Sequence, residues 1–243
     1  MKRINFSKQH LMTALILLLL FSSGCGGEAE APASTPLNTS TSIPPTSPHP
    51  TAYPLPKPKT SGPVSLEVAL QSRRSTRYFT VQELDPGEIS QLLWAAQGIT
   101  DPRGFRTAPS AGALYPLELY IVTADGVFHY LPQKHALEVI QGGDLRAPLQ
   151  DAALGQDPVL EAPLVLVIAA VYERTQVKYG PERSPRYVHL EAGHAAQNVL
   201  LQAVALDLGA VPIGAFYDAG VQAILGLPED HEPLYLIPIG HPE

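Results

Sequence analysis

The chain has 243 residues, and its 16 Lys and Arg against 23 Asp and Glu give a net charge of −7 with His neutral. This acidic balance argues against a nucleic-acid partner, because phosphates are bound by basic surfaces. Hydrophobic residues form 45% of the chain, which is enough for the core of one ordinary domain or two small ones. The one Cys excludes an intrachain disulfide and an all-cysteine metal site.

The N-terminus has the pattern of a targeting segment. Basic residues precede an apolar run over residues 11–21, which is long enough for the core of a signal peptide but too short to span a bilayer. Cys25 follows three small residues, and this arrangement resembles a bacterial lipoprotein signal over residues 1–24 whose mature protein begins at a lipidated Cys25. An ordinary cleaved signal with an incidental Cys is the alternative. We therefore expect export and a lipid anchor in a bacterial membrane, on its extracytoplasmic side.

Residues 25–63 are rich in Pro, Ser and Thr and poor in apolar side chains. Such a composition cannot bury enough surface to offset its loss of chain entropy, so a disordered tether is predicted here. One globular domain is therefore expected over residues 64–243.

Two helices are predicted near the start of this domain. Ser65 is placed to cap a short helix that runs to Gln71. Residues 85–88 read Asp-Pro-Gly-Glu, which supplies the cap, the first-turn proline and the capping-box glutamate of a second helix. Gly98 can end that helix.

The strand signals follow. Residues 117–123 and 127–131 flank an Ala-Asp-Gly turn and predict a hairpin. Residues 164–171 are almost entirely aliphatic, which is typical of a central strand buried on both faces. Strands over 210–216 and 234–239, with a short helix at 219–225 between them, complete the set. Helices and strands mix without strict alternation, which predicts an α+β fold rather than a Rossmann fold.

Ser184 and Pro185 open the longest predicted helix, which ends near Leu208. Its small and aliphatic residues suit close packing, either in the interior or at a subunit interface: Ala192, Ala195, Ala196, Val199, Ala203 and Val204.

Several common catalytic motifs are missing from the sequence. It has no Gly-x-Gly-x-x-Gly after a strand, no Walker-type Gly-Lys-Ser/Thr and no Gly-x-Ser-x-Gly elbow. His189 and His194 would lie about 140° apart around a helix, so they cannot share a metal ion. The sequence therefore predicts no metal site.

Arg73, Arg74 and Arg77 lie with Ser75 in a short stretch at the end of the first predicted helix. A guanidinium group can pair with two phosphate oxygens at once, and a hydroxyl adds a further contact, so the stretch suits a phosphate that carries a polyol. A solvated basic turn is the alternative.

Two further stretches extend this pattern. Residues 109–116 read Pro-Ser-Ala-Gly-Ala-Leu-Tyr-Pro, and residues 209–216 read Gly-Ala-Val-Pro-Ile-Gly-Ala-Phe. Together with the arginine stretch they resemble the nitroreductase family of flavin enzymes, and more closely its SagB-type branch of peptide thiazoline and oxazoline dehydrogenases. The resemblance spans nearly all of residues 66–240. It implies an α+β homodimer with a central, mostly antiparallel sheet flanked by helices, and with FMN at the subunit interface.

The resemblance implies roles for individual residues. The segment that holds the FMN phosphate, ribityl chain and pyrimidine edge is matched by Arg73, Arg74, Ser75 and Arg77. A loop that approaches the flavin, usually from the other subunit, is matched by Pro109, Ser110, Ala111 and Gly112. The stretch along the flavin ring near N5 is matched by Pro212, Ile213, Gly214 and Ala215, for which a buried strand with a tight turn is the alternative.

Lys178 and Tyr179 match a Lys-Tyr pair that azoline dehydrogenases of this branch use beside the flavin. Making an azoline aromatic removes a proton from carbon while hydride goes to N5. A Lys with a lowered pKa as base and a Tyr as relay therefore suit the reaction. An exposed loop Lys and a packing Tyr are the alternative.

We expect an FMN-dependent oxidoreductase that passes hydride through flavin N5, either by dehydrogenating an azoline or by reducing a nitro or quinone compound. Its substrate is expected to be a small molecule or a modified peptide. The family usually has a late Arg or Lys that completes the phosphate site, whereas this chain has neither after Arg186. A flavin-free binding or scaffolding lipoprotein on the same fold is therefore the alternative.

Overall fold

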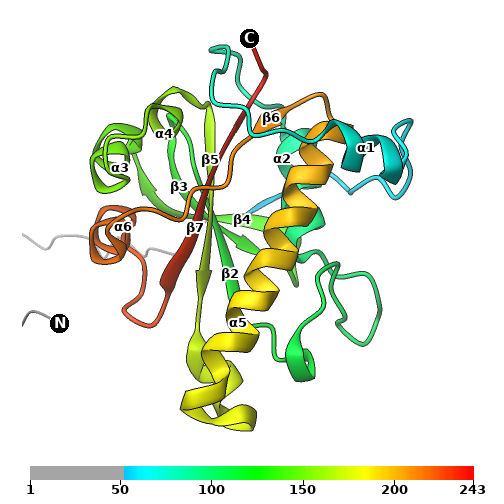
Figure 1. Ribbon diagram of the computed structural model, residues 1–243, viewed down its shortest axis with the longest axis vertical. Helices are drawn as coiled ribbons and strands as arrows, with labels where there is room; N and C mark the ends of the chain where they lie inside the picture. The colour runs from blue at the N-terminus through cyan, green and yellow to red at the C-terminus, as the bar shows by residue number, and fades with distance from the viewer. Residues whose placement is uncertain (1–51) are drawn as a thin grey trace, which may run out of the picture. The chain divides into compact units, whose positions relative to one another are not determined.

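The computed structural model describes residues 52–243, so the predicted signal peptide, Cys25 and most of the predicted tether lie outside the described residues. Residues 52–243 form a seven-stranded sheet in the order β1-β4-β3-β2-β5-β7-β6. Every pair of neighbouring strands is antiparallel. Helices lie on both sides of this sheet (Figure 1). The predicted α+β class with a mostly antiparallel sheet is confirmed.

Three strands form the centre of the sheet, namely β2 (Leu117–Val122), β5 (Leu164–Ala170) and β7 (Glu232–Gly240). Every residue of β5 is buried, because β2 and β7 pair with its two edges and side chains pack on both of its faces. The predicted hairpin is also confirmed, since β3 (Gly126–Leu131) pairs with β2.

The outer strands are the part of the sheet that the sequence predicts least well. β4 (Ala136–Gly142) extends the hairpin, and β1 (Ala52–Pro54) pairs with β4 at one edge. At the other edge, β6 (Gly209–Ala210) pairs with the end of β7. The predicted strand over 210–216 is therefore much shorter in the structure.

Residues 52–63 correct the prediction of a disordered tether up to residue 63. Beyond the pairing of β1 with β4, the Leu55 amide donates to the His135 carbonyl over 2.9 Å, and Lys59 and Gln91 exchange two hydrogen bonds. Most of these contacts use the backbone rather than an apolar core, so composition does not reveal them, and an edge strand tolerates proline. The folded domain includes residue 52 and does not start at 64.

The capping signals locate the first two helices correctly. α1 (Leu66–Ser72) follows Ser65, whose hydroxyl accepts from a backbone amide of the first turn. α2 (Pro86–Gln97) follows Asp85, carries the full capping box and ends at Gly98.

The longest helix, α5 (Tyr172–Ala205), begins well before the predicted start at Ser184. Gly180 has φ 74° and ψ 164° and breaks the helix, and Pro181 follows the break. Glycine adopts a positive φ without strain, and a residue before proline disfavours the helical conformation, so the break divides α5 into two parts. Lys178 and Tyr179 therefore lie in the first helical part and not in a loop.

The two faces of the sheet carry different helices. α2 and α5 contribute to one core cluster, whereas α3 (Arg146–Ala152), α4 (Asp157–Glu161) and α6 (Asp218–Leu225) contribute to the other. The sequence predicts α6 but neither α3 nor α4. Across residues 52–243, no helix has the length and apolar character needed to cross a membrane.

The small residues of α5 belong to the interior of the chain. Ala192, Ala195, Ala196, Val199 and Ala203 are all buried in the core cluster shared with α2 and the sheet. Of the two predicted roles for this stripe, the interior one is therefore correct. The opposite side of α5 exposes Leu190, His194 and Gln197.

Candidate functional site

The arginine stretch lies against the edge strand β6. Ser75 forms a parallel bridge with Ala210, and the Thr76 amide donates to the Ala210 carbonyl over 3.1 Å. A Cβ atom on Gly209 would lie 2.5 Å from Thr76 Cγ2, so this approach requires glycine. The fold thus joins residues 75–76 to residues 209–210, and so places the arginine stretch at the strand that leads into residues 212–215.

The guanidinium groups of this stretch are free to bind an anion. Arg73 is half-buried, Arg74 and Arg77 are exposed, and none of them makes an ion pair within residues 52–243. Arg74 Nη1 donates to the carbonyls of Gln71 and Arg73, at 3.0 and 2.7 Å, which holds its side chain at the end of α1. The stretch therefore presents positive charge on an otherwise acidic protein.

Residues 211–215 continue from β6 along β7. Ile213 and Leu236 exchange backbone hydrogen bonds of 2.8 and 3.0 Å. Val211 and Ile213 are buried, whereas Gly214 and Ala215 are exposed. A Cβ atom on Gly214 would have no neighbour within 4 Å. The buried-strand alternative therefore describes Val211 and Ile213, while Gly214 leaves its backbone open to a ligand. The Ala215 carbonyl accepts a hydrogen bond from Gln156 Nε2 over 2.8 Å.

A second cluster joins the loop over residues 109–113 to the first part of α5. This loop contains a short 3₁₀ turn, Ala111–Ala113, in which Gly112 has φ 65°. A Cβ atom on Gly112 would lie 2.9 Å from Lys178 Nζ and 3.2 Å from Tyr179 Oη. Glycine therefore permits both the backbone conformation and the close contact.

Lys178 and Tyr179 differ in how firmly they are held. Lys178 is exposed, and its Nζ lies 5.5 Å from the centre of the Tyr179 ring. Tyr179 is half-buried and packs on Tyr187, with ring centres 4.5 Å apart. The ring is thus fixed by packing, while the amine can reach a ligand beside the loop.

A buried polar network that the sequence does not predict supports this loop. Glu191 on α5 is 2% exposed and interacts with Ser110, Gln97 and Arg106. Arg106 Nη1 donates to Gln97 Oε1 over 2.9 Å, and the Tyr115 amide donates to Ser110 Oγ over 2.9 Å. Among the described residues, Glu191 Oε1 has no hydrogen-bond partner. The loop therefore lies beside a buried carboxyl group of α5.

Burial raises the pKa of Glu191 to about 7, although Ser110, Arg106 and Gln97 act in the opposite direction. The carboxyl group therefore titrates close to neutral pH. The sequence does contain a signal for this residue. Glu191 shares a helical stripe with Ala195 and Val199, which are buried, so a charged residue at this position is placed toward the core.

A second charged group anchors the start of α5. Arg174 Nη2 pairs with Glu118 Oε1 on β2 at 2.5 Å, and Arg174 Nη1 donates to the Tyr115 carbonyl over 3.2 Å. Burial alone would raise the pKa of Glu118, but the hydrogen bond with His129 and the charge of Arg174 outweigh it and lower the pKa below its usual value. Arg174 lies one helical turn before Lys178 and so fixes the helix that carries it.

The two clusters lie at opposite ends of the second part of α5. The stretch from Pro181 to Ala205 spans about 37 Å at about 1.5 Å per helical residue. Lys178 and Tyr179 precede this stretch. α1, which leads into the arginine stretch, and β6, which contains Ala210, lie beside its other end (Figure 1). One FMN molecule is shorter than this span, so the two clusters of a single chain cannot contact the same FMN.

Known proteins with similar sequences share most of this domain. The profile of the Nitroreductase family matches residues 70–241. A protein of Methanocaldococcus jannaschii named as a nitroreductase, MJ1384, is 47% identical over 183 residues, which cover 73% of this chain and 91% of that protein.

Solved structures show the same similarity. A Ralstonia eutropha structure described as a nitroreductase aligns with a TM-score of 0.71 and 32% identity, over 79% of this chain and 90% of that one. The Escherichia coli microcin synthetase complex McbBCD, solved with truncated pro-MccB17 bound, aligns with a TM-score of 0.61 and 25% identity, over 76% of each chain. This chain spans about half the length of the curated relatives TfxC and McbC, at 54% and 48%.

Proposed function

Because the chain belongs to the nitroreductase family, we propose that it is an FMN-dependent oxidoreductase whose active sites are each completed by a second copy of the chain. The separation of the two clusters along α5 carries this proposal. Within one chain the arginine stretch and Lys178 are too far apart to share a cofactor. A two-fold axis with antiparallel α5 helices would place the arginine end of one copy beside the Gly112 end of the other.

The first cluster fits the phosphate and polyol of FMN. Arg73, Arg74 and Arg77 carry charge that no other described residue neutralises, and Ser75 adds a hydroxyl. Gly214 presents exposed backbone shortly after Ile213, which pairs with β7, and a planar ring could lie against Gly214 and the exposed Ala215. These residues would bind the cofactor and set its position.

The second cluster fits the reacting end of the cofactor and its substrate. Bound FMN would accept or supply a hydride at N5. Lys178 Nζ would take the proton that a substrate carbon releases, and the Tyr179 hydroxyl would relay it. Gly112 would let the loop backbone approach the ring, while the loop is braced by the hydrogen bond from the Tyr115 amide to Ser110 Oγ.

Two reaction classes are compatible with this arrangement. The name of the Methanocaldococcus jannaschii relative supports reduction of a nitro compound, and a quinone would be reduced by the same hydride transfer. The Lys178-Tyr179 pair and the similarity to McbC, named as a microcin B17-processing protein, favour dehydrogenation of an azoline in a modified peptide. The two classes differ in whether a carbon base is needed, and Lys178 substitutions separate them.

The purified protein tests the proposal directly. We expect the absorption bands of oxidised flavin and, after removal of the flavin, tight rebinding of FMN. Riboflavin should bind more weakly, because it lacks the phosphate that the arginines would hold. A colourless protein that binds neither would support the alternative, a flavin-free binding or scaffolding lipoprotein on the same fold.

We also propose that the protein acts outside the cytoplasm, held to a bacterial membrane by a lipid on Cys25. The basic and apolar pattern of residues 1–24 and the small residues before Cys25 support this location. The folded domain would then bind its substrate at the membrane surface.

A further inference from the structure

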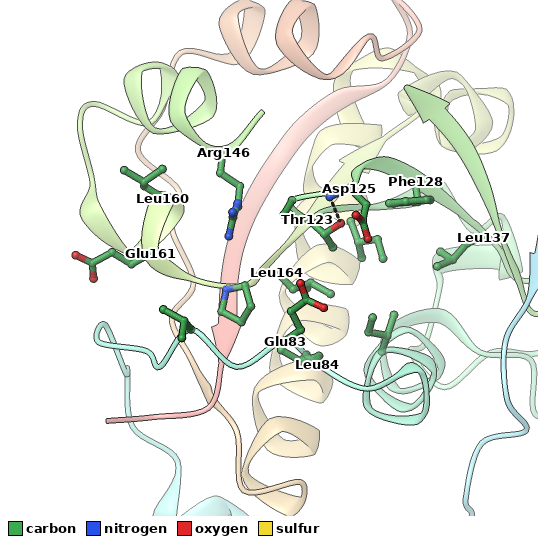
Figure 2. Close-up of a pocket in the computed structure, with 15 residues that line it drawn as sticks. Glu83, Leu84, Thr123, Asp125, Phe128, Leu137, Arg146, Leu160, Glu161 and Leu164 are labelled. Atoms are coloured by element: carbon green, nitrogen blue, oxygen red, sulfur yellow. Dashed lines mark hydrogen bonds between the residues drawn. The ribbon is translucent and has the colours of Figure 1, made fainter. Parts of the chain in front are cut away.

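A pocket of about 470 Å³ opens at the end of β2 that lies away from the loop over residues 109–113. This volume lies within the usual range of small-molecule sites, about 300–1,000 Å³. Its walls are mostly apolar side chains from the strands, the start of α2 and the end of α4, including Leu84, Ile121, Phe128, Leu137, Leu160 and Leu164 (Figure 2).

The pocket is separate from both clusters of the flavin site. None of the residues assigned to FMN lines it, and neither Lys178 nor Tyr179 does. β2 connects the two regions, with Leu117 beside the loop and Thr123 at the pocket, and its six residues span about 20 Å. A ligand could therefore occupy the pocket without touching the second cluster.

The charges at the pocket select against an anion. In Figure 2 the carboxylates of Glu83 and Asp125 and the guanidinium of Arg146 point toward the same space, whereas Glu161 points away from it. Within residues 52–243, neither Glu83 nor Asp125 makes an ion pair.

Arg146 compensates these two carboxylates only in part. Its Nε and Nη2 atoms bind the two carboxylate oxygens of Asp144, at 2.9 and 2.6 Å, and its Nη1 donates to the Ala162 carbonyl. Asp144 therefore takes the direct contacts of Arg146, and Glu83 interacts with the guanidinium only through space. With two carboxylates against one shared cation, the pocket opening keeps a net negative charge.

We propose that this pocket is a second binding site, for a small molecule that joins an apolar body to a protonated amine. Leu84, Ile121 and Leu164 would bury the apolar body, as they already border the main core. The amine would sit at the opening and donate charge-assisted hydrogen bonds to Glu83 and Asp125. A carboxylate or phosphate would instead meet the net negative charge that Glu83 and Asp125 give the opening.

Two probes with the same apolar body and opposite charge test this site. 4-Phenylbutylammonium and 4-phenylbutyrate are titrated into the full chain by ligand-observed NMR. We expect the ammonium probe to bind at least about tenfold more tightly. The double variant Glu83→Gln with Asp125→Asn should abolish this preference, because the two substitutions keep the shape of the pocket and remove the negative charge at its opening.

Substitutions at the opening locate the binding. Ala124 lines the pocket on the exposed turn after β2, so Ala124→Trp should block the ammonium probe while Ala124→Ser should not. Val81, which is 97% exposed at the opening, offers Val81→Trp as a second blocking variant if Ala124→Trp does not fold. Equal affinity for the two probes, or ammonium binding that survives both tryptophans, would overturn the proposal. The flavin content of all variants should be that of the wild type.

Discussion

Gly112 and Lys178 approach so closely that a methyl group on Gly112 would lie 2.9 Å from Lys178 Nζ. The contact joins a loop before β2 to the first helical part of α5. Strands β2, β3, β4 and β5 lie between these two segments in the sequence. It depends on a residue with a positive φ that carries no side chain. The position of Lys178 is therefore set by the loop as well as by its own helix.

Gly112→Ala should reduce turnover by about 10- to 100-fold, because a small displacement of a catalytic group is costly. Gly104→Ala is the matched control: Gly104 also has a positive φ, 88°, but a Cβ there would contact nothing within 4 Å. Both variants should lose about 1 kcal/mol of stability through backbone strain. Turnover and thermal unfolding are measured for both. Equal loss of turnover in the two variants would show that strain, and not the contact with Lys178, is responsible.

Lys178→Ala should keep FMN and slow the turnover of an azoline substrate by about 10²–10⁴-fold, the usual effect of losing a positioned base. Tyr179→Phe should cost less, because it removes only a relay hydroxyl. Reduction of a nitro or quinone acceptor needs no carbon base and should survive both changes. If Lys178→Ala leaves every turnover unchanged while flavin stays bound, the pair is structural and general flavin reduction is the better assignment.

Loss of the Glu191 proton should lower the free energy of unfolding as the pH rises. Its folded-state pKa of about 7 lies above the ordinary value of 4.5, so the folded chain keeps a proton that the unfolded chain releases. The free energy of unfolding therefore falls between about pH 4.5 and pH 7. Glu191→Gln should remove this fall and unfold at a higher temperature than the wild type at pH 8, with little difference at pH 4.5.

Glu118 provides the opposite case on the same protein. Its folded-state pKa is lowered, so its contribution to stability is present above the unfolded pKa and is lost as the pH falls through the folded pKa. Glu118→Gln should therefore destabilise the chain at pH 7 and cost less in acid. Thermal unfolding curves of both variants across pH 3 to 8 check the pair. A shift of the same sign for both at pH 8 would contradict the assigned environments.

Cys25→Ser should release the protein from membranes if Cys25 carries a lipid, because the processed chain would lose its acyl anchor. Fractionation of cells that express each form, followed by detection of the domain in the soluble and membrane fractions, measures this. Equal soluble release of the wild type and the variant would leave an ordinary secretory signal as the better interpretation.

The sequence predicts the parts of the fold that local chemistry determines. Ser65 and Asp85 place two helix starts, and the aliphatic run of β5 predicts a strand covered on both faces. β1 is not predicted, because pairing through the backbone at a sheet edge requires no particular amino-acid composition. The early start of α5 is not predicted, because Gly180 and Pro181 indicate the end of a helix and not its continuation. Tertiary contacts, including the ion pair of Arg174 with Glu118, hold the first part of α5 in place.

The candidate site divides in the same way. The resemblance names the segments that contain Arg73, Gly112 and Lys178, but only the fold shows that they form two clusters at opposite ends of one helix. Glu191 is missed because a single buried carboxyl group matches no motif. Its partners, Gln97 and Arg106, come from other parts of the chain.

Mixed dimers test the two-copy FMN site most directly. Arg73→Ala with Arg77→Ala removes phosphate contacts worth about 1.5–3 kcal/mol each, and Gly112→Trp blocks the other half of the site. Each homodimer should lose most of its FMN, with unfolding curves confirming that the variants fold. A heterodimer isolated through two different tags has one site with both lesions and one intact site.

We therefore measure FMN per dimer in that heterodimer by absorption after titration. A site shared between two copies predicts about one FMN per heterodimer, against about two in the wild type. A heterodimer that binds no more FMN than either homodimer, or a wild-type chain that is monomeric by light scattering with FMN fully bound, would contradict it.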